Sequence, residues 1–164
     1  MERVLIRPAT EADLTPINDI YNHFVLSSTC TYQEEPETAE GRREWFARHD
    51  ADHPVVVAET EGRVVGWGSL SPYHARSAYR RTVEDSVYVH HGYHHRGIGS
   101  ALLSELIERG RARGPRAISA GIDSEQSVSV SLHQRFHFTP AGLLRQVGFK
   151  FGRWLDVIYM ELLL

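Results

Sequence analysis

The stretch between residues 87 and 103, VYVHHGYHHRGIGSALL, constrains the fold more than any other part of this chain. Residues 87–89 favour a strand, and the apolar spacing after Ile98 predicts an amphipathic helix, so Gly97 and Gly99 fall in the connecting turn. Glycine carries no Cβ, so a ligand can approach the backbone closely there. The first amides of a helix have no partners within it, and the helix dipole adds partial positive charge. The segment therefore predicts a cradle for a pyrophosphate group.

Two familiar nucleotide motifs do not describe this turn. It lacks the Lys–Ser/Thr pair of a nucleotide triphosphate loop, and its position in mid-chain argues against the opening βαβ unit of a Rossmann domain. The simplest alternative to a pyrophosphate cradle is an ordinary helix N-terminus that follows a glycine turn. The other alternative is a nucleotide-binding module that uses the same turn.

The bulk composition narrows the class of protein. The chain has 164 residues, which suits one domain over residues 1–164, and its 41% hydrophobic and 24% charged content is ordinary for globular proteins. A net charge of −3 provides no basic field, so we expect neither a nucleic-acid nor a membrane partner. Cys30 is the single cysteine, which excludes an internal disulfide and favours a reducing compartment. The polar N-terminus is unlike a signal peptide, so we expect a cytoplasmic location.

Apolar periodicity and turn residues predict seven strands and four helices. The expected strands are 3–7, 54–59, 63–70, 82–89, 116–122, 143–149 and 155–163, and the expected helices are 14–24, 38–49, 98–113 and 127–137. The helix between strands 82–89 and 116–122 allows those two to run parallel, whereas the other connections favour antiparallel pairing. The predicted fold class is α/β (α+β), with a mixed, mostly antiparallel seven-stranded sheet.

Several short segments, in their joint order and spacing, carry a resemblance to a known family. They are IRPATEADL at 6–14, IYNH at 20–23, ARSAY at 75–79, VEDSVYV at 83–89, RGIGS at 96–100, LH at 132–133 and GFKFGRWLDV at 148–157. With these segments the chain resembles the GNAT superfamily of acetyl-CoA-dependent N-acetyltransferases. Within it, the chain is most similar to the group that acetylates the α-amine of phosphinothricin and of methionine sulfoximine or sulfone.

The resemblance implies how the co-substrate is held. The cofactor lies in a V-shaped opening where the fourth and fifth strands part, with pyrophosphate on the amides of residues 95–100 and the pantetheine arm on the backbone of residues 87–89. The amide of Val89 or its neighbour would face the thioester oxygen. The residues assigned to cofactor binding are Val87, Tyr88, Val89, His94, His95, Arg96, Gly97, Ile98, Gly99, Ser100, Gln126 and Ser129.

Two positions depart from the superfamily's pattern. His94 stands where the cofactor loop usually begins with Gln or Arg, but the loop works through backbone amides, so we expect the cradle to survive. Gln126 stands where many relatives have an Asn that holds the pantetheine arm or the separated strands, so the local contact there is open.

Acetyl transfer to an amine requires a neutral amine, and an amino-acid ammonium is mostly protonated at pH 7. Glu84 is the first candidate for the base, because the resemblance places it where the related group carries one and because partial burial raises a carboxyl pKa. A solvated carboxylate, or an ion pair with Arg80 or Arg81, is the alternative. His133 is the second catalytic candidate, either as the base or as the acid that protonates the leaving thiolate. The alternative is that His133 has only a structural role as a packed side chain. Asp85 should face the opposite side of the strand.

The expected acceptor site uses arginine and aromatic side chains. Three arginines between residues 76 and 81 suit an acceptor with anionic groups, although Arg80 and Arg81 equally suit a solvated loop. The resemblance adds an aromatic residue in the pocket. The residues assigned to the substrate are Tyr32, Arg76, Tyr79, Glu84 and Trp154. Trp154 would close the pocket; the alternative is that it packs in the core or at a dimer interface. Cys30 matches no nucleophile motif, so direct attack without an acyl-enzyme is expected.

Four histidines at positions 90, 91, 94 and 95 invite a metal hypothesis. No nearby carboxylate or cysteine completes a tetrahedral set, so we expect no metal and favour contacts with the phosphates of CoA. The predicted function is acetyl transfer from acetyl-CoA to a small amino acid, in a homodimer with acceptor pockets near its interface. The alternatives are a GNAT enzyme for a polyamine, an aminoglycoside or a protein N-terminus, and a non-catalytic acyl-CoA sensor.

Overall fold

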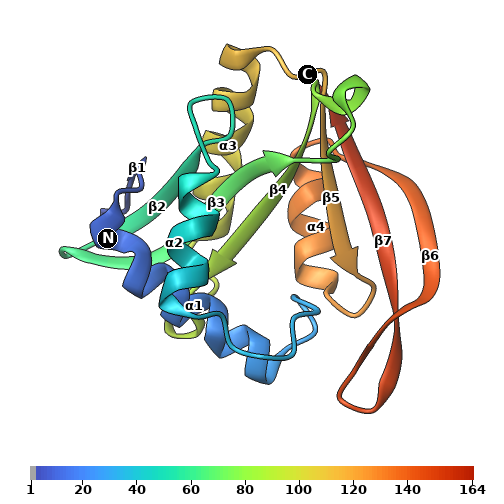
Figure 1. The fold of residues 1–164 in the computed structure, drawn as a ribbon, viewed down its shortest axis with the longest axis horizontal. Coiled ribbons are helices and arrows are strands. Elements are labelled where there is room, and N and C mark those ends of the chain that lie inside the picture. Colours follow the sequence, from blue (N-terminus) through green and yellow to red (C-terminus); the bar gives the residue numbers. More distant parts are fainter. Residues whose placement is uncertain (1–2) are drawn as a thin grey trace.

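The computed structural model describes residues 3–164, which fold into a single α+β domain around one seven-stranded sheet (Figure 1). The strands are β1 Leu5–Pro8, β2 Val55–Thr60, β3 Arg63–Pro72, β4 Thr82–Val89, β5 Ala117–Asp123, β6 Thr139–Lys150 and β7 Arg153–Leu163. The helices are α1 Leu14–Ser27, α2 Ala39–Ala47, α3 Ile98–Arg113 and α4 Ser127–Arg135, with short 3₁₀ turns at Glu11–Asp13, Ser77–Tyr79 and His91–Tyr93. The prediction of seven strands and four helices in this order is confirmed.

Element boundaries differ from the prediction mainly in the last hairpin and the first helix. β6 begins four residues earlier than expected, because Thr139 and Pro140 already pair with Glu161 and Met160 of β7. α1 continues to Ser27, past the last apolar residue of its expected stripe, and the Ser28 amide still donates to the Phe24 carbonyl. Apolar spacing locates the buried middle of an element better than its ends.

The strand order β1-β2-β3-β4-β5-β7-β6 contains one parallel neighbour pair. β4 and β5 pair over only three positions, the last of which joins Glu84 to Ser119. Beyond that position the two strands separate (Figure 1). The edge of β4 that faces β5 is therefore without a strand partner from residue 85 onward, and unpaired backbone groups on such an edge can bind an extended ligand.

Helices cover both faces of the sheet. Leu102, Leu103 and Leu106 of α3 are fully buried against one face, in the larger apolar core, and α4 packs against the same core. α1 and Trp67 of β3 form a second core on the other face. Burial of each large apolar side chain stabilises the fold by about 1.5–3 kcal/mol. The two cores pack against opposite faces of the sheet, and the separated ends of β4 and β5 lie between them.

Side chains on β4 alternate between the two faces. Val83 and Asp85 are buried on the face of α3 and α4, whereas Glu84 and Tyr88 are half-buried on the face of α1. The expectation that Glu84 and Asp85 point to opposite faces is confirmed.

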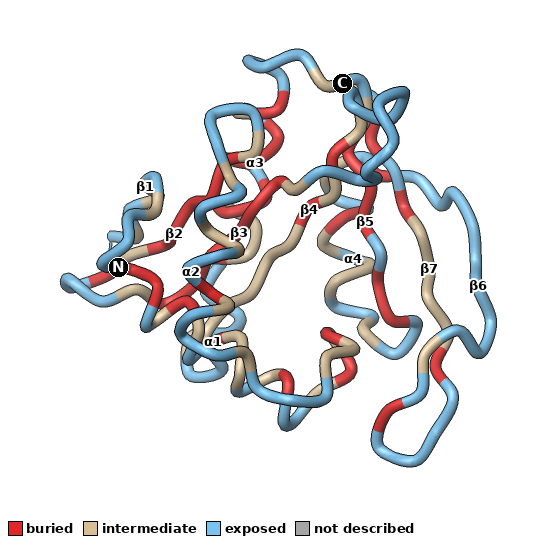
Figure 2. Tube along the Cα trace, in the orientation of Figure 1, coloured by how far each residue is buried: buried red, intermediate tan, exposed pale blue. Residues whose placement is uncertain are grey.

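The β6–β7 hairpin extends beyond the body of the molecule and is exposed along most of β6 (Figure 2). Its turn uses left-handed backbone at Phe151, with φ 52°, and at Gly152, with φ 73°. The exposed large apolar side chains of this hairpin are Leu143, Leu144, Val147, Phe149, Phe151, Trp154 and Leu163. Among the described residues, no helix is long and apolar enough to cross a membrane.

Candidate active site

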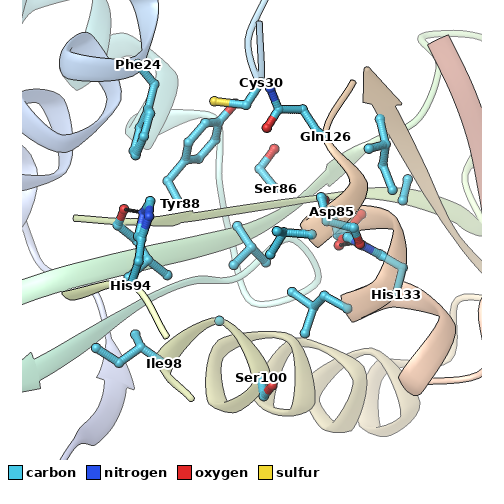
Figure 3. A pocket seen from close by; sticks show the side chains of 18 of the residues that line it. Phe24, Cys30, Asp85, Ser86, Tyr88, His94, Ile98, Ser100, Gln126 and His133 are labelled. Carbon is cyan, nitrogen blue, oxygen red and sulfur yellow. Dashed lines mark hydrogen bonds and ion pairs between the residues drawn. The ribbon is translucent and has the colours of Figure 1, made fainter. Parts of the chain in front are cut away.

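A cavity of about 780 Å³ opens where β4 and β5 separate, at the N-terminal turns of α3 and α4 (Figure 3). Both catalytic candidates, Glu84 and His133, line this cleft. Eleven of the residues assigned to the cofactor line it as well: Val87, Tyr88, Val89, His94, His95, Gly97, Ile98, Gly99, Ser100, Gln126 and Ser129. The twelfth, Arg96, is outside the lining, and its guanidinium lies over the Tyr93 ring at 4.9 Å. Segments far apart in the sequence thus meet at one cleft.

The glycine turn presents open backbone at the start of α3. Gly97 is the N-cap in left-handed conformation, with φ +77°, and apart from its chain neighbours no residue between 3 and 164 has an atom within 4 Å of the position where a Cβ would be. In the described part of the chain no side chain caps the helix, so its first amides are available to a ligand. His95 is also left-handed, with φ 60°. This open, positively polarised turn fits the pyrophosphate of acetyl-CoA.

His94 and Gln126, the two departures from the family's pattern, hold parts of the protein together. His94 Nε2 donates to the Val89 carbonyl at 2.9 Å, and its ring stacks on Phe24 with 3° between the planes. Gln126 Nε2 donates to Thr29 Oγ1 at 3.1 Å and to Ser28 Oγ at 3.5 Å. His94 therefore joins the end of β4 to α1, and Gln126 joins the start of α4 to the loop after α1.

Glu84 has the environment of a base. It is half-buried and makes no hydrogen bond or ion pair within residues 3–164, so the alternative of a pair with Arg80 or Arg81 is not observed. Burial, with a smaller contribution from the neighbouring Asp85 charge, raises the pKa of Glu84 above its ordinary value. A free carboxylate with a raised pKa can accept a proton near neutral pH.

His133 is joined to Asp85 in a buried pair (Figure 3). The distance from His133 Nε2 to Asp85 Oδ2 is 2.8 Å, and the distance from Nδ1 to the Ser129 carbonyl is 2.7 Å. Burial opposes a charge on His133, but the hydrogen bond and charge of Asp85 and the Ser129 carbonyl outweigh it and raise the pKa of the imidazole. Both ring nitrogens therefore have protein partners.

The Asp85–His133 pair was not foreseen from the sequence. Its one local signal is a carboxylate at a core-facing position of β4, between Val83 and Val87. A charged side chain is buried at such a position only when it has a partner. The sequence therefore indicates that Asp85 has a partner but not which residue that is.

The loop after α1 is fastened over the cleft by side chains from distant strands. Lys150, only 2% exposed, donates from Nζ to the carbonyls of Ser28 and Thr31 at 2.8 Å each. On β5, Asp123 accepts hydrogen bonds from the Thr29 hydroxyl at 3.1 Å and from the Tyr32 hydroxyl at 2.5 Å. The loop that carries the pocket-lining Cys30 is thereby held at both ends.

Of the residues assigned to the acceptor, Glu84 lines the cleft, whereas Tyr32, Arg76, Tyr79 and Trp154 lie outside its lining. Tyr32 packs where Gly148 lacks a side chain, so its ring lies against the part of the β6–β7 hairpin near its turn. Arg76 and Tyr79 are exposed in the loop before β4, where the Tyr79 ring lies 5.7 Å from Tyr73. Trp154 is 63% exposed and packs on Phe149, so it is not part of the core of this chain.

Three histidines, His23, His90 and His91, stack on one another beside the glycine turn. The His23 and His91 rings lie 4.0 Å apart, and those of His90 and His91 lie 4.4 Å apart. Within residues 3–164, no group of three or more His, Cys, Asp or Glu side chains is arranged to hold a metal ion. Burial and the neighbouring histidines lower the pKa values of His23 and His90, so these rings favour the neutral form in which they stack.

Comparison with known proteins agrees with the fold. The family described as Acetyltransferase (GNAT) family matches residues 17–138. The chain is 42% identical to the L-amino acid N-acyltransferase MnaT of Escherichia coli, over 96% of this chain and 92% of that protein. It is 40% identical to the L-methionine sulfoximine/L-methionine sulfone acetyltransferase of Salmonella typhimurium, over 96% and 92% respectively. A phosphinothricin acetyltransferase from Sinorhizobium meliloti, solved in complex with AcCoA, matches with a TM-score of 0.95 and 39% identity, over 98% of this chain and 88% of that one.

The chain therefore belongs to the GNAT family of acetyltransferases, and its chemistry is acetyl-CoA-dependent N-acetyl transfer. Within the family it is similar, at about 40% identity, to the group that includes the amino-acid, phosphinothricin and methionine sulfoximine acetyltransferases.

Proposed function

We propose that this acetyltransferase moves the acetyl group to the α-amine of a small amino acid of the methionine sulfone, methionine sulfoximine or phosphinothricin type, by direct attack. Relatives that carry these names match nearly the whole chain. The observation that carries the proposal is the unpaired, half-buried Glu84 carboxylate in the cleft, on the strand that leads to the glycine turn. A non-catalytic sensor has no need of such a base.

Acetyl-CoA, when bound, supplies the activated acetyl thioester. The open amides at the start of α3 bind its pyrophosphate, and the unpaired edge of β4 after Glu84 bonds the pantetheine arm as an added strand would. An amide at the end of β4, at Val89 or its neighbour, faces the thioester oxygen and stabilises the charge that develops there.

Glu84 accepts the proton from the acceptor's ammonium, directly or through a water molecule, because its raised pKa suits proton transfer near neutral pH. His133 is the less suitable base, since both of its ring nitrogens are engaged with Asp85 and Ser129. We therefore assign His133 to positioning β4 against α4, beneath the reacting groups.

The acceptor's anionic groups would pair with Arg76, whose guanidinium makes no hydrogen bond or ion pair with any described residue, with Tyr79 beside it. Tyr32 and Trp154 would complete the pocket. A second copy of the chain would cover the exposed apolar side chains of the β6–β7 hairpin and place the acceptor pockets near the interface, which sedimentation in solution would test. A cytoplasmic location is consistent with this co-substrate and with the single cysteine.

The test measures thiol release from acetyl-CoA with methionine sulfone, methionine sulfoximine, phosphinothricin, the common amino acids, spermidine and kanamycin. We expect activity with the first group and, for Glu84→Gln, a fall in kcat of about 100-fold with unchanged acetyl-CoA affinity. The wild-type kcat/KM should rise with pH through the raised pKa of Glu84, and the variant should lose this rise. Glu105→Gln, a change on the exposed side of α3, is the matched control. Activity confined to spermidine or kanamycin would refute the amino-acid assignment.

A further inference from the structure

The side chain of Tyr159 extends from β7 across the neighbouring strand β5. It pairs with Gly121 in the β5–β7 register. Its ring atom Cε1 is 3.4 Å, and Cζ 3.9 Å, from the position where a Cβ would stand on Gly121. Gly121 itself is exposed and lines the cleft. The missing side chain at Gly121 thus lets the phenol extend from β7 toward the opening between β5 and β4.

The strand registers place Tyr159 and Glu84 on the same face of the sheet. Glu84 pairs with Ser119, and Ser119 shares a face with Gly121 two residues along β5. Neighbouring strands are about 4.8 Å apart, so Glu84 and Tyr159 start about two strand spacings apart across the sheet and two residues apart along it, and the phenol spans part of that distance. Burial, and after it the Glu84 charge, raises the pKa of Tyr159, which agrees with this proximity and keeps the hydroxyl protonated.

The Tyr159 hydroxyl has no hydrogen-bond partner among residues 3–164. By contrast, the hydroxyl of Tyr21 bonds Thr31 and Gln33, and that of Tyr32 bonds Asp123. A half-buried tyrosine hydroxyl normally finds a partner. Here the hydroxyl donor stays available to a molecule beside Gly121, which lines the cleft together with Glu84.

We propose that Tyr159 determines specificity for α-amino acids, by donating its hydroxyl hydrogen bond to the α-carboxylate of the acceptor whose amine Glu84 deprotonates. This inference rests on the proposed function and deepens it. The amine and carboxylate of an α-amino acid are joined through one carbon, which suits two groups that face each other across a short gap. A simple amine would gain nothing from Tyr159.

The test compares methionine sulfone with 3-(methylsulfonyl)propylamine, which is the same molecule without its carboxylate. Tyr159→Phe keeps the ring and removes only the hydroxyl. We expect kcat/KM for methionine sulfone to fall about 10- to 100-fold, the loss typical of one hydrogen bond to a charged group, with the KM for acetyl-CoA and the activity on the amine unchanged. Glu161→Gln, two residues along the same strand and face, is the control and should change neither acceptor.

A second variant tests the position of the ring rather than its hydroxyl. Gly121→Val places methyl groups where the phenol now lies, so it should reproduce the loss that is confined to methionine sulfone, and adding Tyr159→Phe should cost little more. An equal loss for both acceptors, or no loss for either, would overturn the role of Tyr159 while the proposed function stands. A wild-type protein that acetylates no amino acid would overturn both.

Discussion

The two sides of the cleft are built in different ways. The proposed cofactor side comes mainly from one continuous segment, β4 and the first turn of α3, and offers main-chain groups. The proposed acceptor side is assembled from side chains of β4 and the loop before it, of the loop after α1, and of β5, β6 and β7. The first depends on backbone conformation at a few glycines, and the second on contacts between residues far apart in the chain.

The two kinds of construction tolerate sequence change differently. A main-chain cradle tolerates most side-chain changes, so His94 can replace the usual Gln or Arg and still leave the turn open. A side-chain pocket changes with each residue that forms it. A family can therefore keep one co-substrate and alter its acceptor, and substitutions on the two sides should have separable effects.

The largest effect should follow from closing the cradle. Gly97→Val puts a β-branched side chain at φ +77°, so the turn must change and the first amides of α3 must move. Loss of at least two charge-assisted hydrogen bonds should weaken acetyl-CoA binding about 1,000-fold, as measured by calorimetry. Gly62→Val is the matched control, because Gly62 has φ +75°, equally open surroundings and a position in the β2–β3 turn. Similar losses of affinity in both variants would contradict the cradle.

A smaller effect, on stability, should follow from breaking the pair beneath the cofactor side. Asp85→Asn leaves His133 without its charged partner and should lower the free energy of unfolding by about 3 kcal/mol at pH 6, measured by urea denaturation. Because the folded pKa of His133 is raised above its ordinary value near 6.5, the stabilising contribution is complete below that pH and is lost as the pH rises through the folded pKa. The difference between wild type and variant should therefore shrink at alkaline pH.

The exposed Asp50–His53 pair provides the control for that experiment. It has the same residue types at 3.0 Å, but the Asp50 side chain is 65% exposed, so Asp50→Asn should cost less than about 1 kcal/mol. Acetyl-CoA affinity should stay within twofold in Asp85→Asn, because the cradle is main chain. A large loss of affinity would mean that the side-chain pair shapes the cofactor side as well.

The same contrast explains what the sequence could and could not predict. The element order and the glycine cradle were predictable because apolar spacing and backbone requirements are local. The side chain of His133 meets that of Asp85 across 48 positions of sequence, and Lys150 reaches loop carbonyls 119 and 122 positions away. No local sequence pattern predicts contacts between residues so far apart. Four of the five residues assigned to the acceptor, Tyr32, Arg76, Tyr79 and Trp154, correspondingly lie outside the cleft lining of this chain, and Glu84 lies within it.

The smallest effect should come from releasing the loop on the acceptor side. Lys150→Met keeps the buried stem and removes the ammonium that bonds the Ser28 and Thr31 carbonyls, so the loop becomes more mobile and the acceptor binds a less ordered site. We expect the acceptor KM to rise about tenfold, faster hydrogen exchange at residues 28–32, and acetyl-CoA affinity within twofold of wild type. Arg153→Met removes a cation from the same hairpin, but its partner Glu125 is about half exposed, so it should change none of these. If Lys150→Met instead weakened the binding of acetyl-CoA and of the acceptor equally, the two sides of the cleft would not respond separately to substitution. The inference that they are independent would then be wrong.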